Sequence, residues 1–143
     1  MPPSNAFDPV DDGFLNACDA LSAAVDPVQF ERLRWARTEA PMLAHLVELA
    51  HGAVADREDI ELFDEGSGAA IRRYVVKVHG NRIFALVIEL AGRTVSIQAE
   101  VIARSPYKVE AADPLTADFK QFDHALMAAA LGTLFARVKA KPD

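Results

Sequence analysis

The sequence predicts an α+β fold: N-terminal helices, a four-stranded antiparallel β-meander, and a long C-terminal helix packed on the sheet. Residues 71–103 form three runs rich in β-branched and aromatic side chains, which are typical of strands. Residues 14–55 repeat apolar side chains at helical spacing, and residues 125–136 contain no charged residue. At 143 residues, the whole chain (residues 1–143) is expected to form a single domain with a substantial core.

The first helix is expected to begin near Asp11, after a loose tail over residues 1–10 that contains three prolines. Apolar side chains then recur on one helical face, at Phe14, Cys18, Leu21 and Val25. Because Cys18 lies on this stripe, we expect a buried structural thiol, since a reactive cysteine requires an electropositive and partly exposed setting.

Asp26, Pro27 and Gln29 indicate that one helix stops and another begins. Asp26 is suited to the N-cap, Pro27 to the first helical position, and Gln29 to the reciprocal partner of a capping box. The helix that follows is expected to point Phe30 and Leu33 inward.

Pro41 predicts either a kink or the start of a new helix. A proline costs about 3 kcal/mol inside a helix but little in a first turn, so a helix capped near Thr38 and running to about Ala55 accommodates it. The apolar stripe of this helix is Leu43, Leu46, Val47, Ala50 and Val54. After a polar turn, residues 60–63 are expected to form a short first strand.

The strands of the meander are joined by short turns, so neighbouring strands are expected to pair antiparallel. A two-residue Gly92-Arg93 turn of type II′ sets the register of the last two strands. The facing pairs are then Leu90–Val95, Ile88–Ile97, Leu86–Ala99 and Phe84–Val101. Every core-facing partner is apolar, which supports this register. Pro106 marks the fourth strand as an edge or its end.

The preceding hairpin is expected to have a three-residue loop, His79 to Asn81, with Gly80 or Asn81 in the left-handed conformation. This loop pairs Tyr74, Val76 and Val78 with Leu86, Phe84 and Arg82. A two-residue Gly80-Asn81 turn would instead mix charged side chains into the core face of the sheet.

The second face of the meander carries polar side chains around a small apolar centre of Val75, Ala85 and Val87. The candidate ligand-binding residues on this face are Arg73, Lys77, Glu89, Gln98 and Glu100. If the helices leave the face open, these side chains are expected to line a shallow pocket. The alternative is that they form cross-strand pairs on a wet sheet surface.

The last element is predicted to be a helix from about Leu115 to Lys139, capped by Asp113 or Thr116. The face expected to lie on the sheet is Phe119, Phe122, Leu126, Ala129, Ala130 and Thr133. A helix that is apolar on all sides is buried on more than one side. We therefore assign Ala128, Leu131 and Phe135, on the opposite side, to an interface with the N-terminal helices or with a second subunit.

His45, Glu48 and His51 are the candidate metal ligands, because Glu-x-x-His spacing places two ligands on one helical face. Di-iron bundles require two copies of this motif, whereas this sequence has one. The alternative interpretation is a solvated or interface face of the helix.

Two further groups of residues have the composition of anion sites. Arginines flank Trp35 in residues 32–37, which suits a phosphate or a stacked base, although pairing with Glu31 and Glu39 explains them equally. His79 lies beside Gly80-Asn81-Arg82 in a predicted loop, where it either binds an anion or is an ordinary exposed turn residue.

Composition restricts the function classes. With 15 basic against 21 acidic residues the net charge is −6, so nucleic acid is not an expected partner. We expect no membrane span and no signal peptide, because the necessary apolar stretches are missing. With a single cysteine, the chain is expected to be cytoplasmic. Dinucleotide, phosphate-loop, nucleophile-elbow and Cys-x-x-Cys motifs are absent from the sequence, so no cofactor is expected.

The sequence contains no motif that fixes a biochemical activity. The leading expectation is a non-enzymatic binding or adaptor protein that forms a homodimer, with a further protein partner as an additional expectation, because the apolar helix surface is large for a chain of this length. The alternatives are a small-molecule-binding protein or minor enzyme with its site on the open sheet face, and a metal protein using Glu48 and His51.

Overall fold

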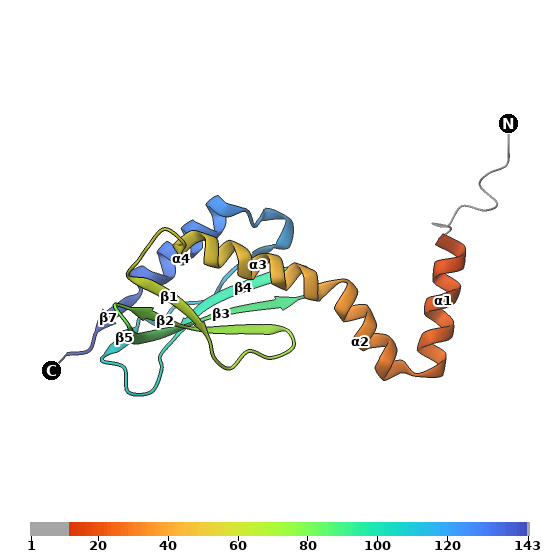
Figure 1. Cartoon of the computed structure of the whole chain (residues 1–143), viewed down its shortest axis with the longest axis horizontal. Helices are drawn as coiled ribbons and strands as arrows, with labels where there is room; N and C mark the ends of the chain where they lie inside the picture. The colour runs from red at the N-terminus through yellow and green to blue at the C-terminus, as the bar shows by residue number, and fades with distance from the viewer. Residues whose placement is uncertain (1–11, 143) are drawn as a thin grey trace. The chain divides into compact units, whose positions relative to one another are not determined.

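The structure of the protein is a computed structural model that describes residues 12–142 (Figure 1). The chain divides into two compact units, residues 1–38 and residues 39–143. The helices are α1 (Asp12–Val25), α2 (Pro27–Arg37), α3 (Glu39–Val54) and α4 (His124–Ala136). The strands are β1 (Ile60–Asp64), β2 (Ile71–Val78), β3 (Asn81–Ala91), β4 (Thr94–Glu100), β5 (Tyr107–Val109), β6 (Leu115–Asp118) and β7 (Val138–Ala140). The tail expected over residues 1–10 lies outside the described residues.

Helices α1 and α2 form the described part of the first unit, and their junction is capped at Asp26 as predicted. The Gln29 N–H donates to Asp26 Oδ1 at 3.1 Å, and Pro27 occupies the first turn. The reciprocal half of the predicted capping box differs, because the Asp26 N–H donates to the Ser22 carbonyl at 3.0 Å. This bond closes the end of α1 at the residue that starts α2.

Neither α1 nor α2 contains a buried residue, and this corrects two predictions. Cys18 is exposed rather than buried. Phe30 is half-buried, and Leu33 is exposed. The apolar stripe of α1 forms as a helical face, and its side chains are exposed within the described residues.

Thr38 separates α2 from α3, so the new helix predicted from Pro41 is confirmed. The Thr38 hydroxyl donates to the Arg34 carbonyl at 2.6 Å, and the Thr38 N–H donates to the same carbonyl at 3.0 Å, so Thr38 caps the end of α2. Helix α3 starts at Glu39, which places Pro41 in its first turn, where a missing N–H costs little. The buried face of α3 is Leu43, Leu46, Leu49, Ala50 and Val54, which differs from the predicted stripe only in Leu49 replacing Val47.

The second unit is an α+β domain with two layers. Its main sheet has five antiparallel strands in the order β1-β2-β3-β4-β6, one more than predicted. Helices α3 and α4 lie side by side and cover one face of this sheet (Figure 1). Ring contacts join the two layers: His51 meets Tyr74 edge-on, and Phe135 meets Phe84 edge-on.

The hairpin of β3 and β4 has the predicted register. Leu90 faces Val95, Ile88 faces Ile97, and Leu86 faces Ala99. Gly92 has a φ of 63°, which the first position of a type II′ turn requires. The expected pair of Phe84 and Val101 is wrong, because β4 ends at Glu100 and the Val101 side chain is 51% exposed.

The hairpin of β2 and β3 has a shorter turn than predicted, together with a β-bulge. Tyr74 faces Leu86 and Val76 faces Phe84 as expected, but Val78 faces Asn81 rather than Arg82. His79 and Gly80 have φ values of 51° and 78°, which is the pattern of a two-residue type I′ turn. The register shifts after Val76 because Ile83 is an extra residue in β3. The bulge, and not an odd-length loop, therefore sets the register in which the core-facing residues of β2 and β3 pair.

Residues 101–109 cross the second face of the sheet. Ile102 packs with Val75 and Ala85 in a buried cluster. The buried hydroxyl of Ser105 donates to the Ile83 carbonyl at 2.6 Å and accepts from the Tyr107 N–H at 3.1 Å. Because a bulged residue loses its partner in the ladder, Ser105 supplies the hydrogen bond that the Ile83 carbonyl would otherwise lack. Strand β5 then pairs antiparallel with β7 in a separate two-stranded sheet.

The long C-terminal helix predicted over residues 115–139 is wrong. Residues 115–118 form strand β6, which pairs with β4, so β4 is not an edge strand. Asp118 caps a 3₁₀ turn with a capping box, and Asp123 caps α4 by accepting the Leu126 N–H at 2.8 Å. Aspartates that bond nearby N–H groups favour caps over helix interiors, which explains why the helix starts late.

The face of α4 that packs inward also differs from the prediction. Its buried residues are Met127, Ala130, Leu131 and Leu134. Of the predicted face, Ala130 and the preceding Phe122 are buried, whereas Ala129 and Thr133 are exposed. An almost uniformly apolar helix carries little information about which side will face the sheet.

Candidate functional site

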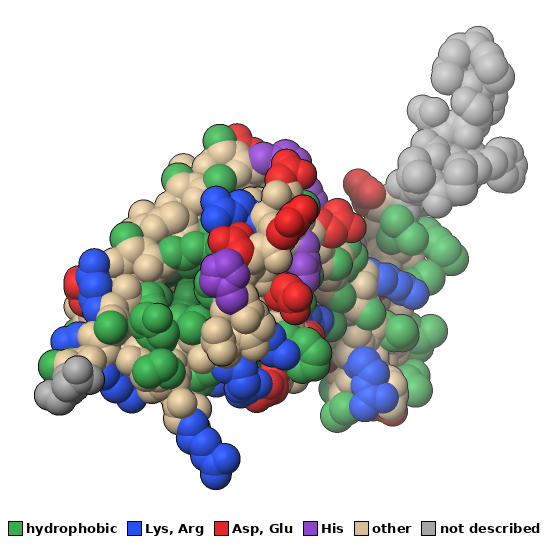
Figure 2. Space-filling view, turned by 60° about the vertical axis from the view of Figure 1, so that its left-hand side comes forward, with side chains coloured by type: hydrophobic (Ala, Val, Ile, Leu, Met, Phe, Trp, Pro, Cys, Tyr) green, Lys and Arg blue, Asp and Glu red, His purple; other side chains and the backbone are tan. Residues whose placement is uncertain are grey.

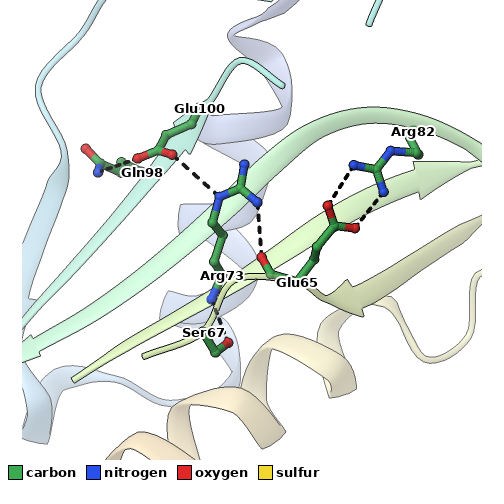
Figure 3. A network of polar contacts seen from close by, with 6 residues as sticks. All are labelled: Glu65, Ser67, Arg73, Arg82, Gln98 and Glu100. Carbon is green, nitrogen blue, oxygen red and sulfur yellow. Dashed lines mark hydrogen bonds and ion pairs between the residues drawn. The ribbon is translucent and has the colours of Figure 1, made fainter. Parts of the chain in front are cut away.

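The predicted ligand-binding residues of the second sheet face lie in part within one polar network (Figure 3). The Arg73 Nε atom lies 3.8 Å from Glu100 Oε2, and Gln98 Nε2 donates to Glu100 Oε1 at 3.4 Å. The Arg73 guanidinium also donates to the Glu65 carbonyl at 3.0 Å, and the Arg73 N–H donates to Ser67 Oγ at 3.0 Å. Arg73 therefore ties the loop after β1 to the sheet.

Glu65 extends the network to β3 through Arg82. The two arginine nitrogens donate to the two carboxylate oxygens at 2.6 and 2.9 Å, a bidentate pair. These hydrogen bonds lower the pKa of Glu65 and raise the pKa of Arg82, so both groups remain charged. The pair is exposed to solvent, and its main effect is to orient Arg82 at the end of the hairpin.

The other two candidates lie outside this network. The Lys77 Nζ atom lies 4.5 Å from the centre of the Phe63 ring, and Glu89 is exposed between Ile71 and Ser96. The apolar centre of the face is closed, because Ile102 covers Val75 and Ala85. The helices leave this face uncovered as the ligand hypothesis required, but residues 101–109 occupy its middle.

His45, Glu48 and His51 are exposed on α3. The His45 ring lies edge-on to Phe119 with centroids 5.9 Å apart, and His51 contacts Tyr74 in the same way at 5.3 Å. Within residues 12–142 no group of three His, Cys, Asp or Glu side chains is arranged to hold a metal ion.

The predicted interface residues of α4 face different surroundings. Leu131 is only 3% exposed and belongs to the core of the second unit. Phe135 packs against Phe84, and Ala128 is exposed. All three border a shallow hollow of about 180 Å³ between α3 and α4.

Most of the exposed large apolar side chains lie instead on α1 and α2, and Figure 2 shows hydrophobic side chains at this part of the surface. Of the nine large apolar side chains that are exposed in the described chain, six belong to these two helices. They are Phe14, Leu15, Leu21, Val25, Val28 and Leu33. Four of these six residues, Phe14, Leu21, Val25 and Leu33, were expected on helical faces that pack inward. We call α1 and α2 together the helical arm.

The helical arm also contains a groove between its two helices, with a volume of about 410 Å³. Cys18, Asp19 and Ser22 line it from α1, and Phe30 and Leu33 are among the residues that line it from α2. Both walls combine apolar and polar side chains.

Charge is distributed unequally between the two helices of the arm. Helix α1 carries Asp12 and Asp19 and no basic residue, whereas α2 carries three arginines and one glutamate. Arg34 Nε lies 3.0 Å from Glu31 Oε2, which is the ion pairing that the sequence analysis offered as an alternative to an anion site.

None of the helices in residues 12–142 is both long enough and apolar enough to cross a membrane. Comparison of the chain with protein-family models, with curated proteins and with solved structures finds no match.

Proposed function

We propose that the protein is a homodimeric, non-enzymatic binding protein, in which the helical arms of two copies pair and hold two copies of the α+β unit together. One observation carries this proposal: the arm exposes six large apolar side chains and buries none of its residues. Exposed apolar side chains that gather on one small unit are typical of an association site.

The size of the arm supports association. Helix α1 has 14 residues and α2 has 11, and helices shorter than about 12–15 residues are marginal in water without tertiary packing. Units below about 40 residues usually need an additional source of stability, such as oligomerisation. Phe14, Leu21 and Val25 are 64%, 67% and 76% exposed, so most of the hydrophobic stabilisation available to α1 remains to be gained from a partner.

A second copy of the arm is the partner that best fits these helices. Phe14, Cys18, Leu21 and Val25 are spaced four, three and four residues apart, which is the seam pattern of helices that pack in coiled coils and bundles. In a two-fold dimer the same surface serves both copies, and charge complementarity favours an arrangement in which the acidic α1 of one copy lies against the arginine-bearing α2 of the other. The expected assembly is a four-helix bundle.

Sedimentation velocity over a range of micromolar concentrations tests the proposal. The wild-type chain is expected to sediment as a dimer, and Leu21→Asp is expected to weaken dimerisation by more than about tenfold, because a carboxylate would be buried in the seam. Val101→Asp is the matched control, since Val101 is a similarly exposed apolar residue of the other unit. A wild-type monomer throughout, or equal effects of the two substitutions, would contradict the proposal.

Cys18 provides an independent measurement, because it is the only cysteine in the chain and lines the groove of the arm. Its reaction with a chromogenic disulfide reagent is expected to slow as the protein concentration rises, since dimerisation covers the thiol. Leu21→Asp should restore the fast reaction at all concentrations. A rate as fast as that of Leu21→Asp, in a chain that sediments as a dimer, would place the interface elsewhere.

A further inference from the structure

A second surface, in the α+β unit, has the features of a small-molecule site. A hollow of about 570 Å³ lies between the tip of the β2–β3 hairpin and the segment Arg104–Tyr107. This volume is within the range of about 300–1,000 Å³ that is usual for ligand pockets. Ile83 and Tyr107 give it an apolar part, and His79, Asn81, Arg82 and Arg104 give it a polar rim.

The rim of the hollow contains arginines but no acidic side chain, although the chain is acidic. Its lining includes two arginines and no carboxylate, whereas the whole chain has a net charge of −6. Arg82 is held in place by its bidentate pair with Glu65. Arg104 is exposed and makes no hydrogen bond or ion pair with any other residue of the described chain. Its guanidinium is thus available to an external oxyanion, which it can bind with two parallel hydrogen bonds.

The backbone around the hollow is fixed by contacts distant in sequence. Ser105 anchors one wall to the bulge at Ile83, on the other wall, through a buried hydrogen bond. His79 and Arg104 have φ values of 51° and 66°, a conformation that residues other than glycine rarely adopt. Such conformations persist only where the surrounding structure imposes them, and they concentrate at functional sites.

We propose that this hollow binds a small organic anion, an apolar and preferably aromatic molecule that carries one carboxylate or phosphate group. The oxyanion lies against Arg104 and Arg82, with Asn81 as a further hydrogen-bond donor, and the apolar body lies against Tyr107 and Ile83. The inference does not rest on the proposed dimer, because every residue in it belongs to residues 39–143.

An NMR titration of the full chain tests this site with phenyl phosphate, benzoate, inorganic phosphate and benzyl alcohol as probes. The amide signals of His79, Asn81 and Tyr107 are expected to shift saturably with at least one aromatic anion. The preference between phenyl phosphate and benzoate identifies the oxyanion. Inorganic phosphate lacks the apolar body and benzyl alcohol lacks the charge, so both should bind more weakly.

Substitutions then distinguish binding in the hollow from general electrostatic attraction of an anion to the protein surface. Arg104→Gln is expected to weaken binding of the preferred aromatic anion by about tenfold, the loss of a charged hydrogen-bond donor. Arg93→Gln is the matched control, because Arg93 also lies in a turn but outside the hollow, near Asp118. Arg104→Gly removes the guanidinium at a backbone conformation that glycine adopts freely, so it should fold and also lose binding. The absence of saturable shifts with either aromatic anion, equal binding of benzyl alcohol, or equal effects at positions 93 and 104 would overturn the proposal.

Discussion

Helices α1 and α3 have similar lengths and similar apolar periodicity, yet the apolar face of α3 is buried and that of α1 is exposed. The 16-residue α3 buries five side chains, whereas the 14-residue α1 buries none. The difference lies in what each helix packs on: α3 lies on a five-stranded sheet, whereas α1 packs on α2, which has 11 residues. Periodicity indicates that a helical face needs to be covered, but it does not say whether the same chain covers it.

The largest expected effect comes from removing equivalent leucines in the two regions. Leu46→Ala, at a fully buried position of α3, should lower the free energy of unfolding by about 3 kcal/mol through lost burial and the resulting cavity. Leu21→Ala, on the exposed face of α1, should change the stability of the α+β unit by less than about 0.5 kcal/mol. Urea titration followed by circular dichroism measures both.

The same titration can separate the two units, because the only tryptophan, Trp35, lies in α2. Its fluorescence should follow the arm, while circular dichroism is dominated by the larger unit. For the monomeric Leu21→Asp variant the fluorescence transition is expected at lower urea. Coincident transitions in that variant would mean that arm and sheet unfold as one cooperative unit.

A smaller effect distinguishes the aspartate N-caps of α2 and α4. Asp123→Ala should lower the free energy of unfolding of the α+β unit by about 1 kcal/mol, because α4 is part of its core and loses the hydrogen bond to the Leu126 N–H. Asp26→Ala removes the equivalent bond to the Gln29 N–H but should leave that transition unchanged and reduce only the helicity of the arm. If both substitutions shift the main transition equally, the arm contributes to the stability of the sheet unit.

The smallest effect concerns pH and is confined to the α+β unit. Arg57 donates two hydrogen bonds to Asp59, at 2.9 and 2.7 Å, and they are the main reason that the pKa of Asp59 falls to about 2. Because the folded-state pKa is below the unfolded value of about 4, this pair contributes stability above pH 4 that is lost as the pH falls through 2. NMR titration of the Asp59 carboxyl checks the value, and Arg57→Gln should raise the pKa of Asp59 toward its ordinary range. An unchanged pKa would refute the assigned cause. The pair is exposed, so its effect on unfolding should be slight.

Local signals were sufficient for much of the fold. Gly92 and the alternation of residues 94–99 predicted the register of β3 and β4, and Pro41 with Thr38 predicted the start of α3. These features depend on neighbours in the sequence. The β2–β3 hairpin was predicted with the correct core-facing pairs at Tyr74 and Val76. A three-residue loop and a two-residue turn followed by a bulge both produce these pairs, and the prediction of the three-residue loop was wrong.

Features formed by distant residues could not be read in this way. Strand β6 has four residues and exists because β4 offers a free edge, so residues 115–118 were absorbed into a predicted helix. Asp123, three residues before Leu126, was a readable cap signal that the uncharged run concealed. The sequence indicated only part of the hollow. His79 and Arg82 are close in sequence and were noted as a candidate anion site, whereas Arg104 lies near them only because Ser105 bonds to the Ile83 carbonyl.

The pairing of β5 with β7 has a consequence for the order of folding. The meander of β2, β3 and β4 relies on contacts close in sequence and can form as soon as those residues are available, whereas the crossing segment is fastened only when Val138–Ala140 reaches Tyr107–Val109. We expect the amide of Lys108 to exchange with solvent faster than that of Val87, because a sheet of two three-residue strands opens without disturbing the larger one. A newly synthesised chain would then form its main sheet before the segment Arg104–Tyr107 is fixed in place. Binding of an anion in the hollow, which needs that segment, would be acquired last.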